Sequence, residues 1–445
     1  MSTIHRILFY GIIIPRKDPD RLYPIFQRIV SMKLFIVIAF ILFSTRASSQ
    51  VADSVLMLKE AKVHFLQKNF YLLAAYYEIA QAEAQLVQAR LWYNPTFIWN
   101  QEAYSNEQNK FLRTGNQFEA QINQTISIAG KHTNTVKLAK VNVELNRVQF
   151  QNVVRSLLFE LERTYNDLAA FEKKETLYAE VLASYERLIA ASEKELQVGA
   201  ISVTEDLRIK SEYITVKADA LDNANQKEQS LSQLRTLLQF PKDTLIVVEQ
   251  RLPVFNPTLQ LDTLIARSLD IRPDLRVARY FQIYQERNVK LQRSLSIPDV
   301  SLGYDYDKAG NYIRNYNGVV LQIPLPVFDR NQGRIQEAQS NLKQSGYQLE
   351  YLKITVANQV IVAFNQYKKI SDGLIVYSDD YLKKLDQLNR NTNIYFQRRD
   401  ISLLQFIDQQ RIYITTNLQL IGLRQQYLNS ISNLNFSVGE IIIDY

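Results

Sequence analysis

The sequence predicts a mixed α/β chain in which four short strands are joined to very long helices, arranged as an internal tandem duplication. Proline is absent from residues 96–240 and again from 327–445, so those stretches contain no residue that must break a helix. Polar and apolar residues alternate in four segments, as in strands whose two faces meet different surroundings. The order of parts in the first half recurs in the second, roughly 200 residues later.

The N-terminal residues 1–49 have the pattern of an export presequence with a signal peptide. Met32 and Lys33 precede the apolar run Leu34–Phe43, and Ala47-Ser48-Ser49 forms a small-x-small cleavage site. Ten apolar residues are too few for a membrane-spanning helix. We therefore predict a mature chain that begins near Gln50. Met32 is the expected start of translation, and an extended n-region is the alternative.

The basic charge of the chain belongs mainly to this presequence. It carries seven Lys and Arg against two Asp, a net of +5 out of the formal +7, which leaves about +2 for the mature chain. The composition therefore gives no indication of a nucleic-acid partner. Cysteine is absent, only three histidines are present, and the GxSxG, HExxH and P-loop motifs are missing. We predict neither enzymatic activity, nor a metal site, nor a cofactor.

The first half begins, after a helix, with a strand entered at Asn94-Pro95, and a second strand alternates from Phe118 to Ile128. Polar, turn-rich residues 105–116 lie between them and predict a hairpin. Each strand is about ten residues long, which is the length a tilted strand needs to cross a bilayer. A soluble, half-buried sheet is the alternative. Aromatic residues gather near the strand ends, as interfacial girdles require: Trp92, Tyr93, Phe97, Trp99, Tyr104, Tyr304, Tyr306, Tyr312 and Tyr316.

The second half repeats this order, with alternation over Val300–Asp307 and Val319–Ile323 around a polar stretch at 308–315. Apolar residues at three-and-four spacing predict long helices over the ranges 132–198, 203–239, 332–396 and 403–437. A helix of about 65 residues would be roughly 100 Å long. The predicted division of the chain is a first repeat over 50–240, a connecting segment over 241–272, a second repeat over 273–437 and a tail over 438–445.

Four membrane-crossing strands cannot close a barrel alone, because an open sheet in lipid leaves its edge N–H and C=O groups unpaired. Two copies would give about eight strands around a filled interior, whereas three would give about twelve strands around a pore. Long helices that are polar over most of their surface favour the second arrangement, since they can line a water-filled tube.

These residues resemble the TolC-like outer-membrane efflux family, and specifically its heavy-metal branch, over nearly the whole mature chain. The resemblance is carried by Asn94-Pro95, Ser127–Lys131, Arg272-Pro273-Asp274-Leu275 and, most specifically, Ile323–Gly333. It implies a homotrimer whose transmembrane β-barrel, four strands per chain, continues into a long periplasmic α-helical barrel. Such a channel has no active site. It passively exports what an inner-membrane resistance-nodulation-division transporter delivers through a periplasmic adaptor protein.

The resemblance also assigns roles to a few positions in the outer-membrane channel. The turns at Gly199-Ala200-Ile201-Ser202 and Arg399-Asp400-Ile401-Ser402 match the helical tips that contact the adaptor. Asp408 matches a ring of carboxylates that narrows the tip, and Gln405 takes the place of its acidic companion. The strand–helix transitions fall at Gly130, Pro324 and Pro326. An ordinary helix reversal and a solvated helix face are the alternatives for the tips and for Asp408.

Two other functions fit parts of the same pattern. A periplasmic coiled-coil adaptor would also have a signal peptide and long helical hairpins, but it leaves the two strand pairs unexplained. A channel for drugs or other organic substrates has the same architecture as a metal channel. The mature chain has one Met, two His and no Cys, so any selection of metal cations would belong to the pump and adaptor.

Overall fold

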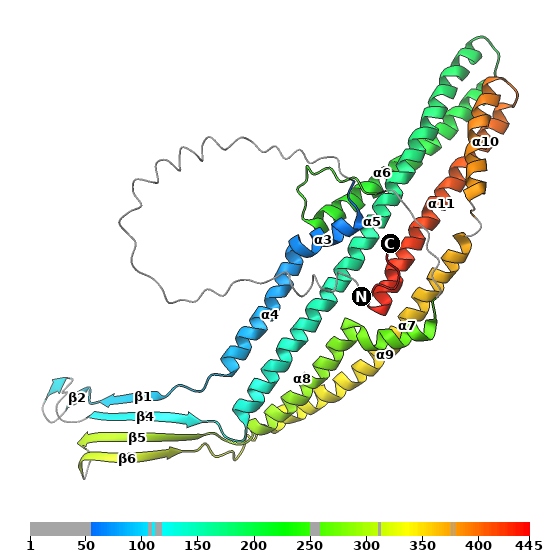
Figure 1. Cartoon of the computed structure of the whole chain (residues 1–445). Helices are drawn as coiled ribbons and strands as arrows, with labels where there is room; N and C mark the ends of the chain where they lie inside the picture. The colour runs from blue at the N-terminus through cyan, green and yellow to red at the C-terminus, as the bar shows by residue number, and fades with distance from the viewer. Residues whose placement is uncertain are drawn as a thin grey trace, which may run out of the picture. The chain divides into compact units, whose positions relative to one another are not determined.

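The computed structural model describes residues 55–105, 109–111, 118–249, 259–309, 313–374, 377 and 379–445, all within one compact unit. The predicted presequence and Tyr312 lie outside these residues. Figure 1 shows the elements in chain order. They are α3 Leu58–Lys68, α4 Phe70–Ala89, β1 Thr96–Gln101, β2 Tyr104–Ser105, β3 Lys110–Phe111, β4 Phe118–Ile126, α5 Lys131–Gln197, α6 Val203–Leu238, α7 Leu261–Ile271, α8 Pro273–Leu295, β5 Val300–Ala309, β6 Arg314–Gln322, α9 Gln332–Leu374, α10 Asp379–Gln397 and α11 Leu403–Val438.

Helix α5 confirms the prediction of a very long helix, since it runs unbroken for 67 residues. It contains neither glycine nor proline, and one stripe of its surface is buried while the rest is polar and partly exposed. At 1.5 Å per residue it is about 100 Å long. Helices α6 and α11 begin at the predicted residues and end within one residue of the predicted ends.

The predicted single helix over 332–396 is wrong. The structure has two helices there: α9 ends at Leu374 and α10 begins at Asp379. Gly373 lies in the last turn of α9, and glycine is the weakest helix former after proline. The N–H of Tyr377 bonds the carbonyl oxygen of Leu374 at 3.1 Å, which turns the chain between the two helices.

The four long strands form one antiparallel sheet in the order β1-β4-β5-β6, which confirms the two predicted hairpins. Strand β1 is shorter than predicted, at six residues, because the chain leaves the sheet at Glu102-Ala103 and then forms the two-residue pair β2–β3. The second hairpin is tighter than predicted. Ala309 pairs with Arg314, so both strands extend into the expected loop.

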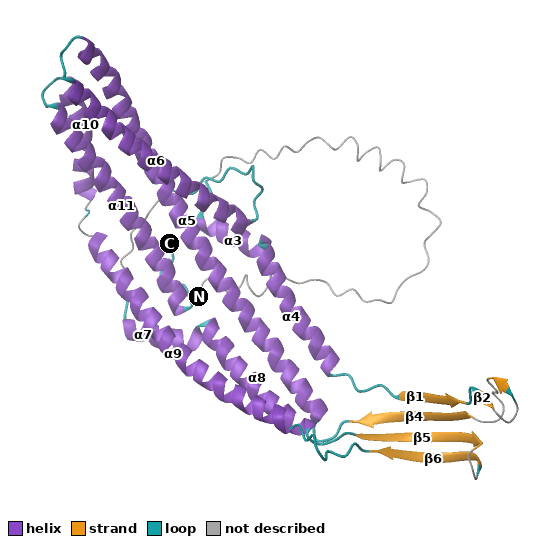
Figure 2. Ribbon diagram, turned by 180° about the vertical axis from the view of Figure 1, so that it is seen from behind, coloured by secondary structure: helices purple, strands orange, loops and turns teal. Residues whose placement is uncertain are grey.

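Helices pack side by side in the same order as the strands they adjoin. Helix α4 contacts α5, α5 contacts α8, and α8 contacts α9. This follows from connectivity, because α4 leads into β1, β4 into α5, α8 into β5 and β6 into α9. Beyond this layer, α6 packs on α5, and α11 packs on both α5 and α9. Figure 2 shows the strands extending away from the helices, so no described helix covers either face of the sheet.

Candidate functional site

The sheet has one apolar and one polar face. The pairing register places Phe97, Trp99, Ile122, Tyr304 and Leu321 on one face, together with Phe118, Ala120, Leu302, Tyr306 and Val319, and Gln101, Gln124 and Asn317 are its polar members. The opposite face carries Asn100, Glu119, Gln121, Asn123, Thr125, Ser301, Asp305 and Asp307, with Ile98, Tyr316 and Val320 as its apolar members. Strands β1 and β6 are the free edges, and each keeps a row of backbone groups without a partner strand among the described residues.

The strand–helix transitions differ between the two halves. Four residues, Ser127–Gly130, connect β4 to α5, and Gly130 adopts a left-handed backbone with φ of +72° as the N-cap. Lys131 then turns inward, and its ammonium group meets the Asp299 carboxylate at 2.7 Å. Nine residues connect β6 to α9, and both Pro324 and Pro326 are exposed there.

The two helical tips have the same backbone geometry, although their sequences differ. Gly199 and Arg399 both adopt left-handed conformations, with φ of +71° and +61°. The N–H of the next residue, Ala200 or Asp400, bonds the carbonyl five residues earlier at 2.8 Å in both tips. This is the Schellman arrangement that ends a helix. This arrangement requires one residue with a left-handed backbone, and in the second tip that residue is Arg399.

Each tip then starts the next helix with a capping box. The Ser202 hydroxyl accepts from the N–H of Glu205, whose carboxylate accepts from the N–H of Ser202 at 2.8 Å. Ser402 and Gln405 repeat the arrangement with an amide, and the Gln405 oxygen lies 2.9 Å from the Ser402 nitrogen. The structure thus gives Gln405 a capping role. Ile201 and Ile401 are half-buried at the two turns.

Apolar packing and exposed ion pairs hold the two tips together. Tyr178, Val181 and Ile209 of the first hairpin share a core with Phe406 and Ile407 of the second. Arg399 of one tip pairs with Glu195 of the other at 2.9 Å, and Arg411 pairs with Glu212 farther along α11 and α6 from the tips. The Arg399–Glu195 pair is exposed on both sides and Arg411 is exposed beside a partly buried Glu212, so the shared core contributes most of the cohesion.

Asp408 is exposed on α11, in the second turn after Ser402. Its carboxylate has no hydrogen-bond or ion-pair partner among the described residues. A different carboxylate, Asp206, is buried close by on α6, where it accepts from the Ser192 hydroxyl at 2.8 Å and pairs with Lys210 at 3.0 Å. The Ser192 hydrogen bond, followed by the Lys210 contact, holds the pKa of Asp206 below its usual range.

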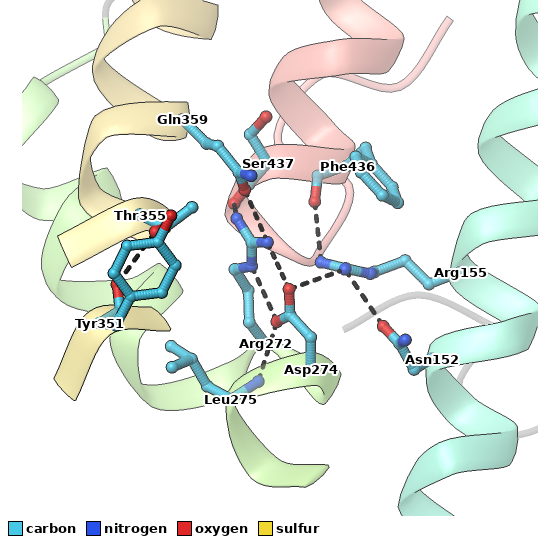
Figure 3. Close-up of polar contacts among 10 residues, drawn as sticks. All are labelled: Asn152, Arg155, Arg272, Asp274, Leu275, Tyr351, Thr355, Gln359, Phe436 and Ser437. Carbon is cyan, nitrogen blue, oxygen red and sulfur yellow. Dashed lines mark hydrogen bonds and ion pairs between the residues drawn. The ribbon is translucent and has the colours of Figure 1, made fainter. Parts of the chain in front are cut away.

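A buried ion-pair cluster joins the four helices α5, α8, α9 and α11 (Figure 3). Arg272 is only 2% exposed, and it bonds Asp274 through Nε at 3.0 Å and through Nη2. Its Nη1 donates to the Ser437 carbonyl at 2.8 Å, and Nη2 also donates to the Gln359 side-chain oxygen at 2.9 Å. Arg155 of α5 adds a second guanidinium, 3.2 Å from Asp274.

The two arginines lower the pKa of Asp274, the carboxylate of this cluster. Burial by itself raises the pKa of Asp274, but the hydrogen bonds of Arg272 and the charges of Arg155 and Arg272 outweigh burial and leave that pKa below its usual range. The two guanidiniums also bond the carbonyls of Phe436 and Ser437 at the C-terminal end of α11, where the helix dipole favours cations. The cluster therefore fixes the end of α11 against α5, α8 and α9.

Sequence reasoning noted Arg272-Pro273-Asp274-Leu275 only as a resemblance and missed its partners. Arg155 lies 119 residues from Asp274, and Ser437 lies 165 residues from Arg272. No local pattern could have brought them together.

Among the described helices, none has the length and apolar character needed to cross a membrane. In the same part of the chain, no group of three or more His, Cys, Asp and Glu side chains could hold a metal ion.

Comparison with known proteins decides the family. The model of the outer membrane efflux protein family matches residues 63–238 and 264–440, which is most of the chain. The chain belongs to the outer membrane efflux protein family. It is therefore an outer-membrane protein with a periplasmic extension, and the expectation that it is not an enzyme is confirmed.

Individual members of this family agree in sequence and fold. The chain is 25% identical over 379 residues to the cobalt-zinc-cadmium resistance protein CzcC of Cupriavidus metallidurans, which covers 84% of this chain and 87% of CzcC. The crystal structure of the Campylobacter jejuni CmeC outer membrane channel matches with a TM-score of 0.70 and 18% identity, over 87% of each chain. CusC matches with a TM-score of 0.67 and 18% identity, over 86% of this chain and 92% of CusC. The family's fold is thus the fold of this chain.

Proposed function

We propose that three copies of the mature chain form the outer-membrane channel of a tripartite efflux pump. The observation that carries this proposal is the open four-stranded sheet with one apolar face, one polar face and two free edges. Pairing β1 of one copy with β6 of the next satisfies both edges, directs the apolar face to lipid and encloses a polar lumen. Three copies give twelve strands, which is enough for a water-filled pore.

The long helices continue this channel through the periplasm and end at the two tips. The tips present Gly199-Ala200-Ile201-Ser202 and Arg399-Asp400-Ile401-Ser402 as matched turns, and these are our proposed contacts for an adaptor protein that links the channel to an inner-membrane transporter of the resistance-nodulation-division class. Equal backbone geometry supports the proposal, because a repeated partner surface needs repeated turns. The two ranges matched by the family model support the division into a first and a second repeat.

We propose metal cations as the cargo, on the likeness to CzcC, a cobalt-zinc-cadmium resistance protein. The charges of the channel wall support a cationic cargo, because the described part of the polar face of the sheet carries three carboxylates against one cation, Arg314. Glu119 and Asp307 are paired across β4 and β5 on the polar face, with Asp305 next to them, and Asp408 is unpaired on α11. Rings of carboxylates favour cations in a pore. The carboxylates thus attract cations into the channel without forming a metal-binding site among the described residues. The choice of one metal over another would belong to the pump and the adaptor.

The mass of the purified complex and its conductance in a planar bilayer test the channel. We expect a three-chain complex in detergent with a low conductance, which Asp408→Asn and Asp408→Ala increase by weakening a constriction of carboxylates. Asp219→Asn is the matched control, because Asp219 is exposed on α6 far from the turn. A monomer without conductance would contradict the channel.

Cargo is tested in cells that lack the channel gene. Restored tolerance to cobalt, zinc or cadmium on expression of this chain would support metal export. Restored tolerance to organic drugs alone would instead identify a drug channel with the same architecture.

A further inference from the structure

The connection between β6 and α9 presents an unusual density of apolar side chains to the surroundings. Every residue from Leu321 to Arg330 is exposed. Leu325, Val327 and Phe328 are 79%, 60% and 92% exposed. Contiguous exposed apolar residues mark surfaces that are covered by a partner or a membrane.

The length of this connection is not needed to join strand to helix. In the first half, Ser127–Gly130 makes the equivalent connection from β4 to α5 with four residues, and Lys131 directly after it is buried against Asp299. The second half uses Ile323–Asn331, nine residues, to join strands and helices of the same sheet and the same layer. The additional residues include the apolar ones.

The apolar face of the sheet continues into this connection. Val319 and Leu321 share a face with their pairing partners Tyr304 and Leu302. Ile323 and Leu325 keep the apolar alternation of the sequence after β6 ends at Gln322, and extended backbone at 3.3 Å per residue would carry the apolar face about 10 Å beyond the sheet. The chain then turns, because the N–H of Val327 bonds the Leu325 carbonyl at 2.9 Å.

The backbone of this extension is suited to a low-polarity environment. Pro324 and Pro326 have no N–H, so this segment exposes two fewer backbone donors than a segment of the same length without proline. Asp329 and Arg330 follow immediately and are exposed. An apolar segment that ends in charged residues is the pattern of a chain at the boundary between acyl chains and headgroups.

We propose that Leu325, Val327 and Phe328 of each copy insert into the periplasmic leaflet of the outer membrane, with Arg330 at the level of the phospholipid phosphates. This membrane-interface anchor rests on the proposed membrane-spanning sheet. It holds the start of α9 against the bilayer, at the free edge of the sheet.

The alternation favours lipid over a neighbouring copy as the surface that covers this anchor. Edge-to-edge pairing of β6 with another strand covers backbone N–H and C=O groups. Side chains stand perpendicular to the sheet, so those of Val319 and Leu321 stay uncovered after such pairing and face the bilayer, and the exposed Leu325 follows them in the same alternation.

Single cysteines carrying an environment-sensitive NBD label test the anchor, because the natural chain has no cysteine. The test variants are Leu325→Cys and Phe328→Cys. Val319→Cys, on the apolar face of β6, is the reference for lipid, and Val198→Cys, at the tip, is the reference for water. Ala129→Cys is the matched control in the shorter connection. All are reconstituted in vesicles of phosphatidylethanolamine and phosphatidylglycerol.

We expect the labels at 325 and 328 to emit at shorter wavelength than the label at 198 and to be quenched less by aqueous iodide. Among spin-labelled lipids, those with the spin label near the headgroup should quench them most. The label at 319 should be quenched most by a spin label deep in the chains. The label at 129 should not be quenched by lipid.

Three results separate the possibilities. Iodide quenching at 325 and 328 as complete as at 198 would overturn the anchor, and so would protection from both iodide and lipid, because a second copy would then cover the segment. Absence of lipid quenching at 319 would instead refute the membrane-spanning sheet itself.

Discussion

Replacing Asp274 by alanine should destabilise the protein far more than an average substitution. Arg272 is almost completely buried, and it would lose the carboxylate that neutralises it while Arg155 stays nearby with the same charge. Arginine cannot release its proton, so the site cannot become neutral. Removing one partner of a buried ion pair costs about 3–5 kcal/mol.

Replacing Arg272 by methionine should cost less, about 1–3 kcal/mol for the acceptors of Ser437 and Gln359 that are left without a donor. Asp274 would keep Arg155 and the N–H of Leu275 as partners. The sharper prediction is the double variant. Adding Arg272→Met to Asp274→Ala removes the more deeply buried of the two guanidiniums that have lost their carboxylate, and leaves Arg155 as the other. The free energy of unfolding of the double variant should therefore equal or exceed that of Asp274→Ala alone.

Pulse proteolysis in urea, at one protein and one detergent concentration, measures these differences, because an oligomer's stability depends on concentration. Arg272→Lys is a useful control that keeps the charge but loses the planar fork. A loss below about 1 kcal/mol for Asp274→Ala, a value typical of exposed ion pairs, would refute the reasoning. Additive losses in the double variant would refute it as well.

Three further substitutions test other contacts. Gly439→Ala should lower stability by about 1–3 kcal/mol in the same urea assay, because φ is +96° and the added carbon would lie 2.8 Å from Cγ of Arg272; an unchanged midpoint would contradict this. Gly199→Ala should cost about 1 kcal/mol, since alanine is disfavoured at φ of +71°, and protease cleavage at the tip should rise; equal cleavage would argue against the strain. Asp206 has a lowered pKa, so its contribution is present above about pH 3.9 and is lost as pH falls through the lower folded value. Ser192→Ala removes its first hydrogen-bond donor and should move acid unfolding to higher pH, as followed by helical circular dichroism; an unchanged midpoint would exclude a stabilising role.

The sequence alone determined the elements that depend on local pattern. An unbroken α5, the two hairpins β1–β4 and β5–β6, and the turns at Gly199 and Arg399 follow from missing helix breakers, period-two alternation and the internal repeat, whereas the pairing of β4 with β5 does not. These signals lie within a few residues of one another, so they can be read without a fold. The family also followed from the sequence, because its motifs are contiguous.

Tertiary structure alone decided how distant segments meet. The sequence shows Arg272 and Asp274 as neighbours, but only packing of α5, α9 and α11 supplies Arg155, Gln359 and Ser437. The end of α9 at Leu374 was hidden as well, because one glycine weakens a helix without ending it, and its environment decides. The unusual exposure of the connection after β6 likewise appears only from the structure, where the first-half connection is shorter and has Ser127 and Ile128 half-buried. Contacts between residues far apart in sequence depend on the whole packed arrangement of helices, and no local pattern specifies them.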